Sequence, residues 1–111
     1  MSDLKERFDR ERKEHPALMY MKGNALFPKC GYSAQALALL QSYGEKVHAV
    51  DVLVEPGVRD GIKAYTGFPT IPQIFLRGEF IGGLDILMQM HEAGELKAKL
   101  GTSAPESTKP A

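Results

Sequence analysis

The sequence has little cysteine, no tryptophan and no excess of charge of either sign. Its one cysteine among 111 residues cannot supply an internal disulfide or a structural metal site. Fourteen Lys and Arg balance fourteen Asp and Glu, so the chain lacks the positive field that drives binding to nucleic acid. No apolar run approaches the roughly 20 residues of a membrane span, and the charged segment 1–7 does not resemble a signal peptide. We therefore expect a cytoplasmic protein that binds neither nucleic acid nor membrane.

The composition is that of one ordinary globular domain, with 43% hydrophobic and 25% charged residues. At this length, folding hides roughly two-thirds of the unfolded chain's surface, which allows a core without covalent crosslinks. The end of the chain is different, because residues 101–111 are small, polar or proline. We expect a folded domain over residues 1–100 and a disordered tail over 101–111.

Hydrophobic patterning predicts alternating helices and strands. The first helix, over 2–15, has few apolar residues among its charges and is expected to be largely solvated. Two buried strands are predicted, one over 17–21 from a continuous apolar run and one over 47–52 from β-branched residues. The remaining predicted elements are helices over 32–43, 58–66 and 84–93, a last helical turn over 95–100, and a hairpin of strands over 73–77 and 79–81. This order predicts an α/β fold, a mixed four-stranded sheet flanked by helices on both faces.

The lone cysteine, Cys30, falls at the predicted N-terminus of a helix. Helix N-terminal amides and the helix dipole stabilise a thiolate, and Lys22 at the end of the preceding strand can add a positive charge. A free cysteine is more often a small buried hydrophobe. Here Pro28, Lys29 and Gly31 make a polar, constrained turn, which is a poor setting for a packing residue. The local sequence therefore favours a reactive or metal-binding thiol.

Several separated motifs resemble those of the monothiol glutaredoxins, a thioredoxin-fold family, over about residues 3–100. Residues 21–23 resemble its Met-Lys-Gly, and residues 30–33 its Cys-Gly-Phe-Ser, with Tyr32 in place of phenylalanine. Residues 69–73, Pro-Thr-Ile-Pro-Gln, resemble its proline turn, and residues 78–86 its Gly-Glu-Phe-Ile-Gly-Gly-Cys-Asp-Ile segment. Leu84 replaces the cysteine of that last segment, and Phe68 replaces a tryptophan.

The resemblance implies a bound glutathione. Lys22 and Arg59 then correspond to the cations that hold its glycine carboxylate. The bond before Pro72 is implied to be cis, and the backbone of Ile71 is implied to pair with the cysteine part of the ligand. The start of the last long helix, at Leu84 and Asp85, is implied to receive the γ-glutamyl group through backbone N–H groups and the Asp85 carboxylate.

The missing second cysteine excludes a two-cysteine reaction, because Ser33 stands three residues after Cys30. By resemblance, Cys30 and glutathione from each of two chains ligate a 2Fe-2S cluster across a homodimer, and a BolA-like protein can replace one subunit. The chain would then store the cluster and transfer it to iron-sulfur acceptor proteins. The family's carriers share a long segment before the cysteine, here 25–29, which favours this role.

Two other functions remain open. In the first, Cys30 attacks glutathione mixed disulfides as a monothiol oxidoreductase. In the second, the chain is an adaptor whose groove binds a peptide edge and whose cysteine has no chemical role.

Overall fold

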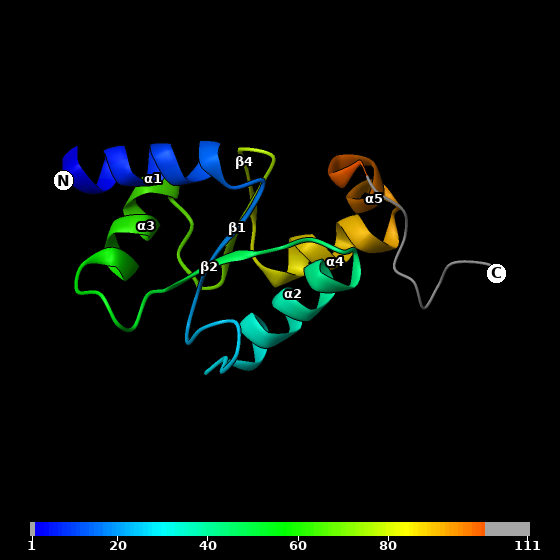
Figure 1. Cartoon of the computed structure of the whole chain (residues 1–111), viewed down its shortest axis with the longest axis horizontal. Coiled ribbons are helices and arrows are strands. Elements are labelled where there is room, and N and C mark those ends of the chain that lie inside the picture. The colour runs from blue at the N-terminus through cyan, green and yellow to red at the C-terminus, as the bar shows by residue number, and fades with distance from the viewer. Residues whose placement is uncertain (1, 102–111) are drawn as a thin grey trace.

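The computed structural model describes residues 2–101 and shows a central sheet enclosed by helices (Figure 1). The sheet has four strands in the order β2-β1-β3-β4. Strand β1 pairs with β2 in parallel and with β3 antiparallel, and β3 pairs with β4 antiparallel. The strands are β1 (Ala17–Met21), β2 (His48–Asp51), β3 (Gln73–Leu76) and β4 (Glu79–Gly82), and the helices are α1 (Ser2–Glu14), α2 (Gly31–Ser42), α3 (Val58–Thr66), α4 (Leu84–Glu92) and α5 (Glu95–Leu100). The mixed α/β sheet predicted from the sequence is confirmed.

Alternation along the central strands divides the core into two layers. Met19 and Met21 face the cluster packed under α2, α4 and α5, whereas Leu18 and Tyr20 face the cluster under α1 and α3. Figure 1 shows these two groups of helices on opposite sides of the strands. All of β1 is buried, as its continuous apolar run predicted.

Proline and glycine set several boundaries. Helix α1 ends before Pro16, because a residue that precedes proline is disfavoured in helical geometry. Helix α3 ends at Gly67, whose positive φ of 77° lets its N–H donate to the carbonyl of Lys63. None of the helices within residues 2–101 is long and apolar enough to cross a membrane. Of the tail predicted over 101–111, residues 102–111 lie outside the described residues.

The prediction that α1 is largely solvated holds for most of the helix but misses two residues that are buried, Phe8 and Glu11. Phe8 is buried and makes an edge contact with Tyr20, whose ring in turn meets Phe75. Glu11 is also buried, and its carboxylate accepts a hydrogen bond from the Tyr20 hydroxyl at 2.5 Å. A few residues on one face are enough to seal this side of the sheet, although most of the helix is charged.

The prediction that the second strand is buried is wrong, because β2 lies at the edge of the sheet. Its burial falls mainly on Val50, while His48 is exposed. The His48 ring stacks on that of His15, with ring centroids 3.7 Å apart and planes 5° from parallel. The β-branched content indicated a strand but not whether that strand had one neighbour or two.

Candidate functional site

Cys30 occupies the N-cap position of α2. Its backbone is extended, with φ −147° and ψ 132°, and its carbonyl accepts the N–H of Ala34 at 2.9 Å. The thiol is free and half-exposed. No side chain caps the first turn of α2, so its N–H groups are available to an anion. The structure therefore places the thiol where the sequence predicted, at an open helix N-terminus.

The surroundings of Cys30 lower the pKa of its thiol below the usual value. The largest influence is the backbone N–H of Ser33, and partial burial opposes it. The backbone N–H of Tyr32, the Ser33 hydroxyl and the positive charge of Lys22 also lower this pKa, in decreasing order. Each of these groups stabilises the negative thiolate, which is the form that attacks disulfides and binds metal.

Ser33 also connects α2 to the end of β1. Its side chain is fully buried, and its hydroxyl oxygen accepts the backbone N–H of Lys22 at 3.3 Å. The same hydroxyl thus anchors the lysine backbone and contributes to stabilising the Cys30 thiolate. The sequence showed Ser33 only as the absence of a second cysteine, and a positioning role was not predicted.

Residues 22–29, called the Cys30 loop below, fold into a small closed hairpin. The N–H of Lys29 donates to the carbonyl of Lys22 at 2.9 Å, and Gly23 forms an isolated bridge with Pro28. Gly23 is required here, because its φ is 87° and a Cβ would lie 2.5 Å from the backbone of both Phe27 and Lys29. The loop therefore has a defined shape that leads the chain directly into Cys30.

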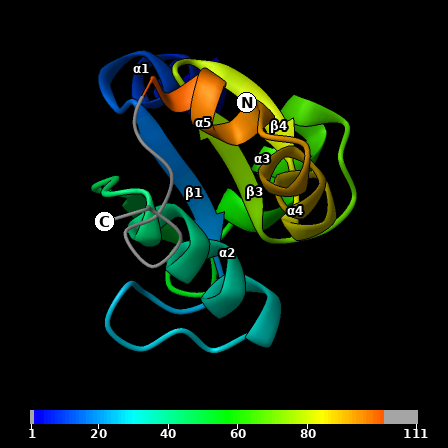
Figure 2. The same cartoon turned by 90° about the vertical axis from the view of Figure 1, so that its right-hand side faces the viewer.

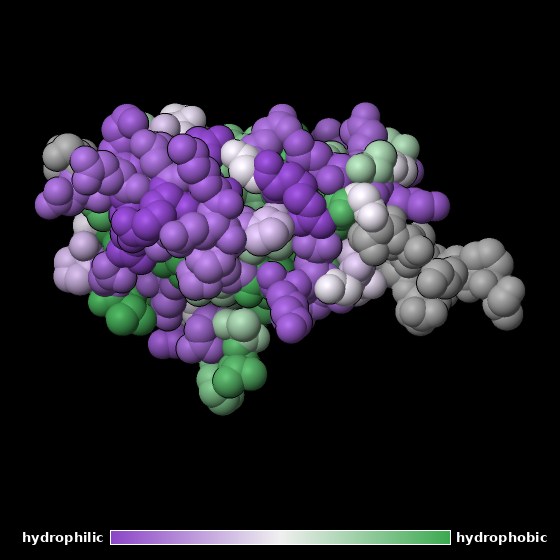
Figure 3. All heavy atoms as spheres, turned by 45° about the horizontal axis from the view of Figure 1, so that its top comes forward, coloured by the Kyte–Doolittle hydropathy of each residue, from purple (hydrophilic) through white to green (hydrophobic). Residues whose placement is uncertain are grey.

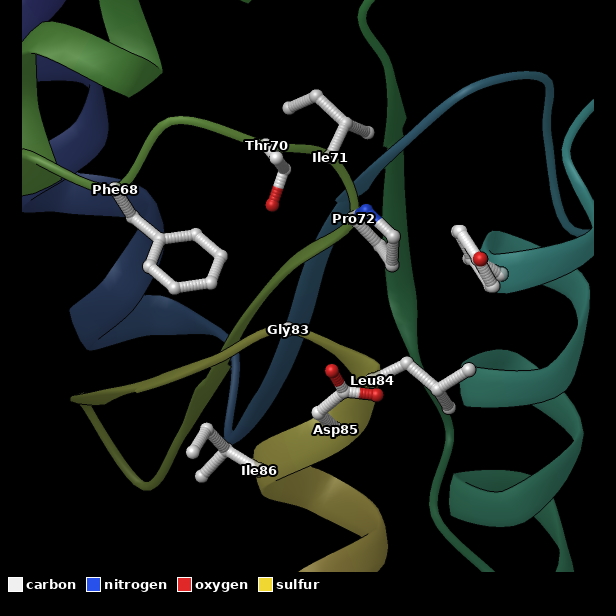
Figure 4. Close-up of a pocket in the computed structure, with 9 residues that line it drawn as sticks. Phe68, Thr70, Ile71, Pro72, Gly83, Leu84, Asp85 and Ile86 are labelled. Atoms are coloured by element: carbon white, nitrogen blue, oxygen red, sulfur yellow. The ribbon is translucent and has the colours of Figure 1, made fainter.

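A pocket of about 260 Å³ opens beside the start of α2. In Figure 4, the segment from Thr70 to Pro72 lies along one side of it and the beginning of α4 along another. The Phe68 ring stands at the wall and makes an edge contact with Phe80, with ring centroids 5.6 Å apart. The residues that line the pocket are Tyr32, Phe68, Thr70, Ile71, Pro72, Gly83, Leu84, Asp85 and Ile86.

The Gln73 side chain holds the segment before β3, residues 68–72, in place. This buried side chain donates its amide N–H groups to the carbonyls of Phe68 at 2.8 Å and Thr70 at 3.1 Å. The Ile71–Pro72 peptide bond is cis, as the resemblance implied. Within residues 2–101, no backbone hydrogen bond engages Ile71, so its N–H and C=O can pair with an extended ligand.

The start of α4 forms the opposite part of the pocket. Gly83 is the N-cap, no side chain caps this turn, and Asp85 is the acidic residue of the first turn. Figure 4 shows the Asp85 carboxylate directed toward the pocket and the Leu84 side chain directed toward α2. Free N–H groups beside a carboxylate can receive the carboxylate and the ammonium of one amino-acid group.

The structure brings together only some of the residues predicted for glutathione. Ile71, Leu84 and Asp85 line the same pocket. Lys22 lies at the end of β1, close enough for its charge to act on Cys30. Arg59 is exposed at the start of α3 and lines a separate hollow with residues 52–57 and Asp60.

Sequence reasoning did not assign Thr70 or Ile86 to the site. The sequence placed Thr70 in the proline turn and Ile86 in a helix, and neither pattern indicated a position at the pocket. Within the described part of the chain, no three or more His, Cys, Asp or Glu side chains are grouped so that they could hold a metal ion. The described residues therefore offer Cys30 no set of neighbouring side chains that could complete a metal site.

The sheet order, the cis-proline turn and the open helix N-terminus define a thioredoxin-fold protein with a single thiol. The family model for glutaredoxin matches residues 17–81. The chain is 40% identical to glutaredoxin 4 of Escherichia coli over 104 residues, which is 94% of this chain and 90% of that protein. It is 47% identical over 92 residues to the mitochondrial monothiol glutaredoxin-S4 of Oryza sativa, covering 83% of this chain. This chain belongs to the monothiol glutaredoxins.

Solved structures agree with this assignment. A truncated, monomeric form of Trypanosoma brucei 1-C-Grx1 superimposes with a TM-score of 0.80 at 37% identity, over 90% of this chain and 94% of that one. A buckwheat glutaredoxin in complex with glutathione gives a TM-score of 0.80 at 22% identity, covering 90% of this chain and 89% of that one, and shows likeness of fold. The chain spans 50% of the length of the rice relative and 57% of that of Arabidopsis thaliana glutaredoxin-S15.

Proposed function

We propose that this chain binds glutathione in the pocket beside Cys30 and carries a 2Fe-2S cluster between two copies of itself. The observation that carries the proposal is a lone thiol of lowered pKa, at an open helix N-terminus, next to a pocket with unpaired backbone groups. Clusters of this type are held by four thiolates. One cysteine from each of two chains and one thiol from each of two glutathiones make up that number.

The pocket suits the chemistry of glutathione. The free backbone of Ile71 can pair with the peptide part of the ligand, and the start of α4 with Asp85 can receive its γ-glutamyl end. Lys22 and Arg59 are proposed to hold the glycine carboxylate, which requires the Arg59 side chain to reach beyond the hollow that it lines. The buckwheat glutaredoxin of the same fold has been solved as a glutathione complex.

The proposed role is storage of the cluster and its transfer to acceptor proteins. A BolA-like protein is proposed as an alternative to the second copy. Cys30 is half-exposed and lies at the edge of the fold, so a cluster held there stays accessible to another protein.

The lowered pKa of Cys30 also favours a second candidate, a glutathione-dependent monothiol oxidoreductase. The Cys30 thiolate would attack the glutathione sulfur of a mixed disulfide, forming a Cys30–glutathione disulfide and releasing the substrate thiolate. The thiolate of a second glutathione would attack that sulfur, which releases Cys30 and forms glutathione disulfide.

Anaerobic reconstitution with iron, sulfide and glutathione tests the carrier role. We expect a coloured dimer with sulfur-to-iron charge-transfer bands, seen together by visible absorption and size-exclusion mass. The same mixture without glutathione, and the Cys30→Ser variant with it, should stay colourless and monomeric. A full iron and sulfide load in Cys30→Ser would reject the ligand assignment. A colourless wild-type monomer that reduces glutathione mixed disulfides would favour the oxidoreductase.

A further inference from the structure

Two apolar side chains are held in solvent at the tip of the Cys30 loop. Leu26 is 83% exposed and Phe27 is 71% exposed. The Asn24 carboxamide oxygen accepts both of their backbone N–H groups, at 3.0 Å and 2.8 Å. These bonds and the bridge between Gly23 and Pro28 hold the loop in one shape. The two side chains, called the hydrophobic tip below, are therefore presented to solvent by an ordered hairpin.

The hydrophobic tip belongs to the hairpin that leads directly into Cys30. Figures 1 and 2 both place the Cys30 loop at the lower edge of the molecule, next to the start of α2. In Figure 3, hydrophobic side chains stand out from the lower edge of a mostly hydrophilic surface. Cys30 is only half-exposed, so the tip projects further into solvent than the thiol does. A second protein that approaches Cys30 from this side meets the tip.

We propose that the hydrophobic tip is the main protein contact between two copies of this chain around the shared cluster. The inference rests on the proposed function, because that function brings two Cys30 thiolates to one cluster. Each chain has a single cysteine, so the second thiolate comes from another chain presenting the same face. With two identical copies related by a two-fold axis, the tip packs against the partner twice.

Charge explains why this contact needs the cluster. Lys22 and Lys29 are joined by a backbone hydrogen bond at the base of the tip. In a pair of copies without ligand, the lysines of both chains would be brought together and repel each other. The thiolates of the cluster and the carboxylates of two glutathiones place negative charge between them. The tip therefore stabilises the loaded dimer, and the chain without ligand stays monomeric.

The double variant Leu26→Ser/Phe27→Ser tests the contact. Its matched control is Leu53→Ser/Val54→Ser, which removes exposed apolar side chains, 49% and 74% exposed, from the loop after β2. After anaerobic reconstitution with glutathione, sedimentation velocity over a range of protein concentrations gives the dimer dissociation constant. Calorimetry of glutathione binding to the monomers checks that the pocket is intact. We expect the tip variant to raise the dissociation constant at least about tenfold and the control to stay within about twofold. Both should bind glutathione as the wild type does.

Three other outcomes would overturn the inference, and they differ in what they say about the cluster role. A tip variant that dimerises as tightly as the wild type would reject the contact and leave the cluster role standing. A wild-type chain that takes up no cluster would reject both the contact and the proposed function. A third outcome combines two results: the wild type but not the tip variant cosediments with phosphatidylcholine–phosphatidylserine vesicles, and the tip variant dimerises as the wild type does. This outcome would assign the tip to a lipid surface instead.

Discussion

The Oδ1 atom of Asp51 accepts a hydrogen bond from the backbone N–H of Gly23 at 3.1 Å. The same atom accepts the N–H of Leu53 at 2.9 Å. One carboxylate at the end of β2 thus joins the loop that leads to Cys30 and the loop that leads to Arg59. It connects the two segments that carry the proposed cations, Lys22 directly before Gly23 and Arg59 six residues after Leu53.

Replacing Asp51 should weaken glutathione binding without touching the ligand. Asp51→Ala removes both hydrogen bonds, and we expect about a fivefold loss of affinity, equivalent to on the order of 1 kcal/mol. Asp51→Asn keeps an oxygen acceptor and should stay close to the wild type. Calorimetry on both variants measures the difference. Equal losses in Asp51→Asn and Asp51→Ala would show that the charge, and not the loop connection, matters.

The Ser33 hydroxyl should lower the pKa of Cys30 more than the Lys22 charge does, because its influence on this pKa is the larger of the two. The rate of alkylation by iodoacetamide as a function of pH gives this pKa. We expect it to rise in Ser33→Ala and to rise less in Lys22→Gln. Tyr32→Phe is the control, because it keeps the backbone N–H and should leave the pKa unchanged. A larger rise in Lys22→Gln would contradict the structure.

Reversing either proposed cation should weaken glutathione retention, because a carboxylate would then face a carboxylate. We expect Lys22→Glu and Arg59→Glu each to lower the affinity at least about tenfold, in line with the 1.5–3 kcal/mol of a typical charge-assisted hydrogen bond. Lys97→Glu makes the same charge change on α5, away from the pocket, and serves as the control. Unchanged affinity in Arg59→Glu would limit Arg59 to the separate hollow.

The buried Tyr20 hydroxyl should contribute to stability through Glu11. Both side chains are buried, and burial together with the neighbouring Glu11 carboxylate raises the pKa of Tyr20, so its hydroxyl stays a donor. Tyr20→Phe leaves the carboxylate without this donor, and we expect a loss of about 1–3 kcal/mol in the free energy of unfolding. Urea denaturation measures it. Tyr32→Phe changes an exposed ring and should stay within about 0.5 kcal/mol of the wild type.

The histidine stack should make stability fall in mild acid. Although His48 is exposed overall, the partial burial of its imidazole, and then the nearby His15, lower the pKa of His48. The folded state therefore resists protonation of His48, so this stability is present above the unfolded pKa of about 6.5 and is lost as the pH falls through the folded value. Thermal unfolding should show a drop in Tm on acidification that is smaller in His48→Gln. In NMR titrations, His15→Gln should raise the His48 pKa, and an unmoved value would contradict the proposed coupling.

Local sequence signals predicted most of the fold. The apolar run of β1, the turn after β3 and the cysteine at a helix start depend on neighbours in the chain, which patterning can detect. Whether β2 lies inside the sheet or at its edge depends on strand order, so its burial was mispredicted. The burial of Phe8 and Glu11 likewise depends on α1 docking against a distant strand.

The sequence predicted the parts of the candidate site that lie in recognisable motifs and missed the other parts. The resemblance directed attention to Ile71, Leu84 and Asp85, which the fold places around one pocket. It gave no sign that Arg59 lines a different hollow, because side-chain direction depends on the turn before α3. The Asp51 connection joins loops far apart in the sequence and has no local signature.

The pocket wall belongs to a row of aromatic rings that crosses the molecule. Phe68 meets Phe80, Phe80 meets Phe75 with centroids 5.2 Å apart, and Phe75 meets Tyr20 in the layer under α1. The chain has no tryptophan, so Phe68→Trp would give it a single fluorophore that can be excited selectively. Its emission would report occupancy of the pocket, whereas far-ultraviolet dichroism would report the folded helices and strands. One chain could then be followed by two optical signals, separating ligand binding from unfolding in the same sample.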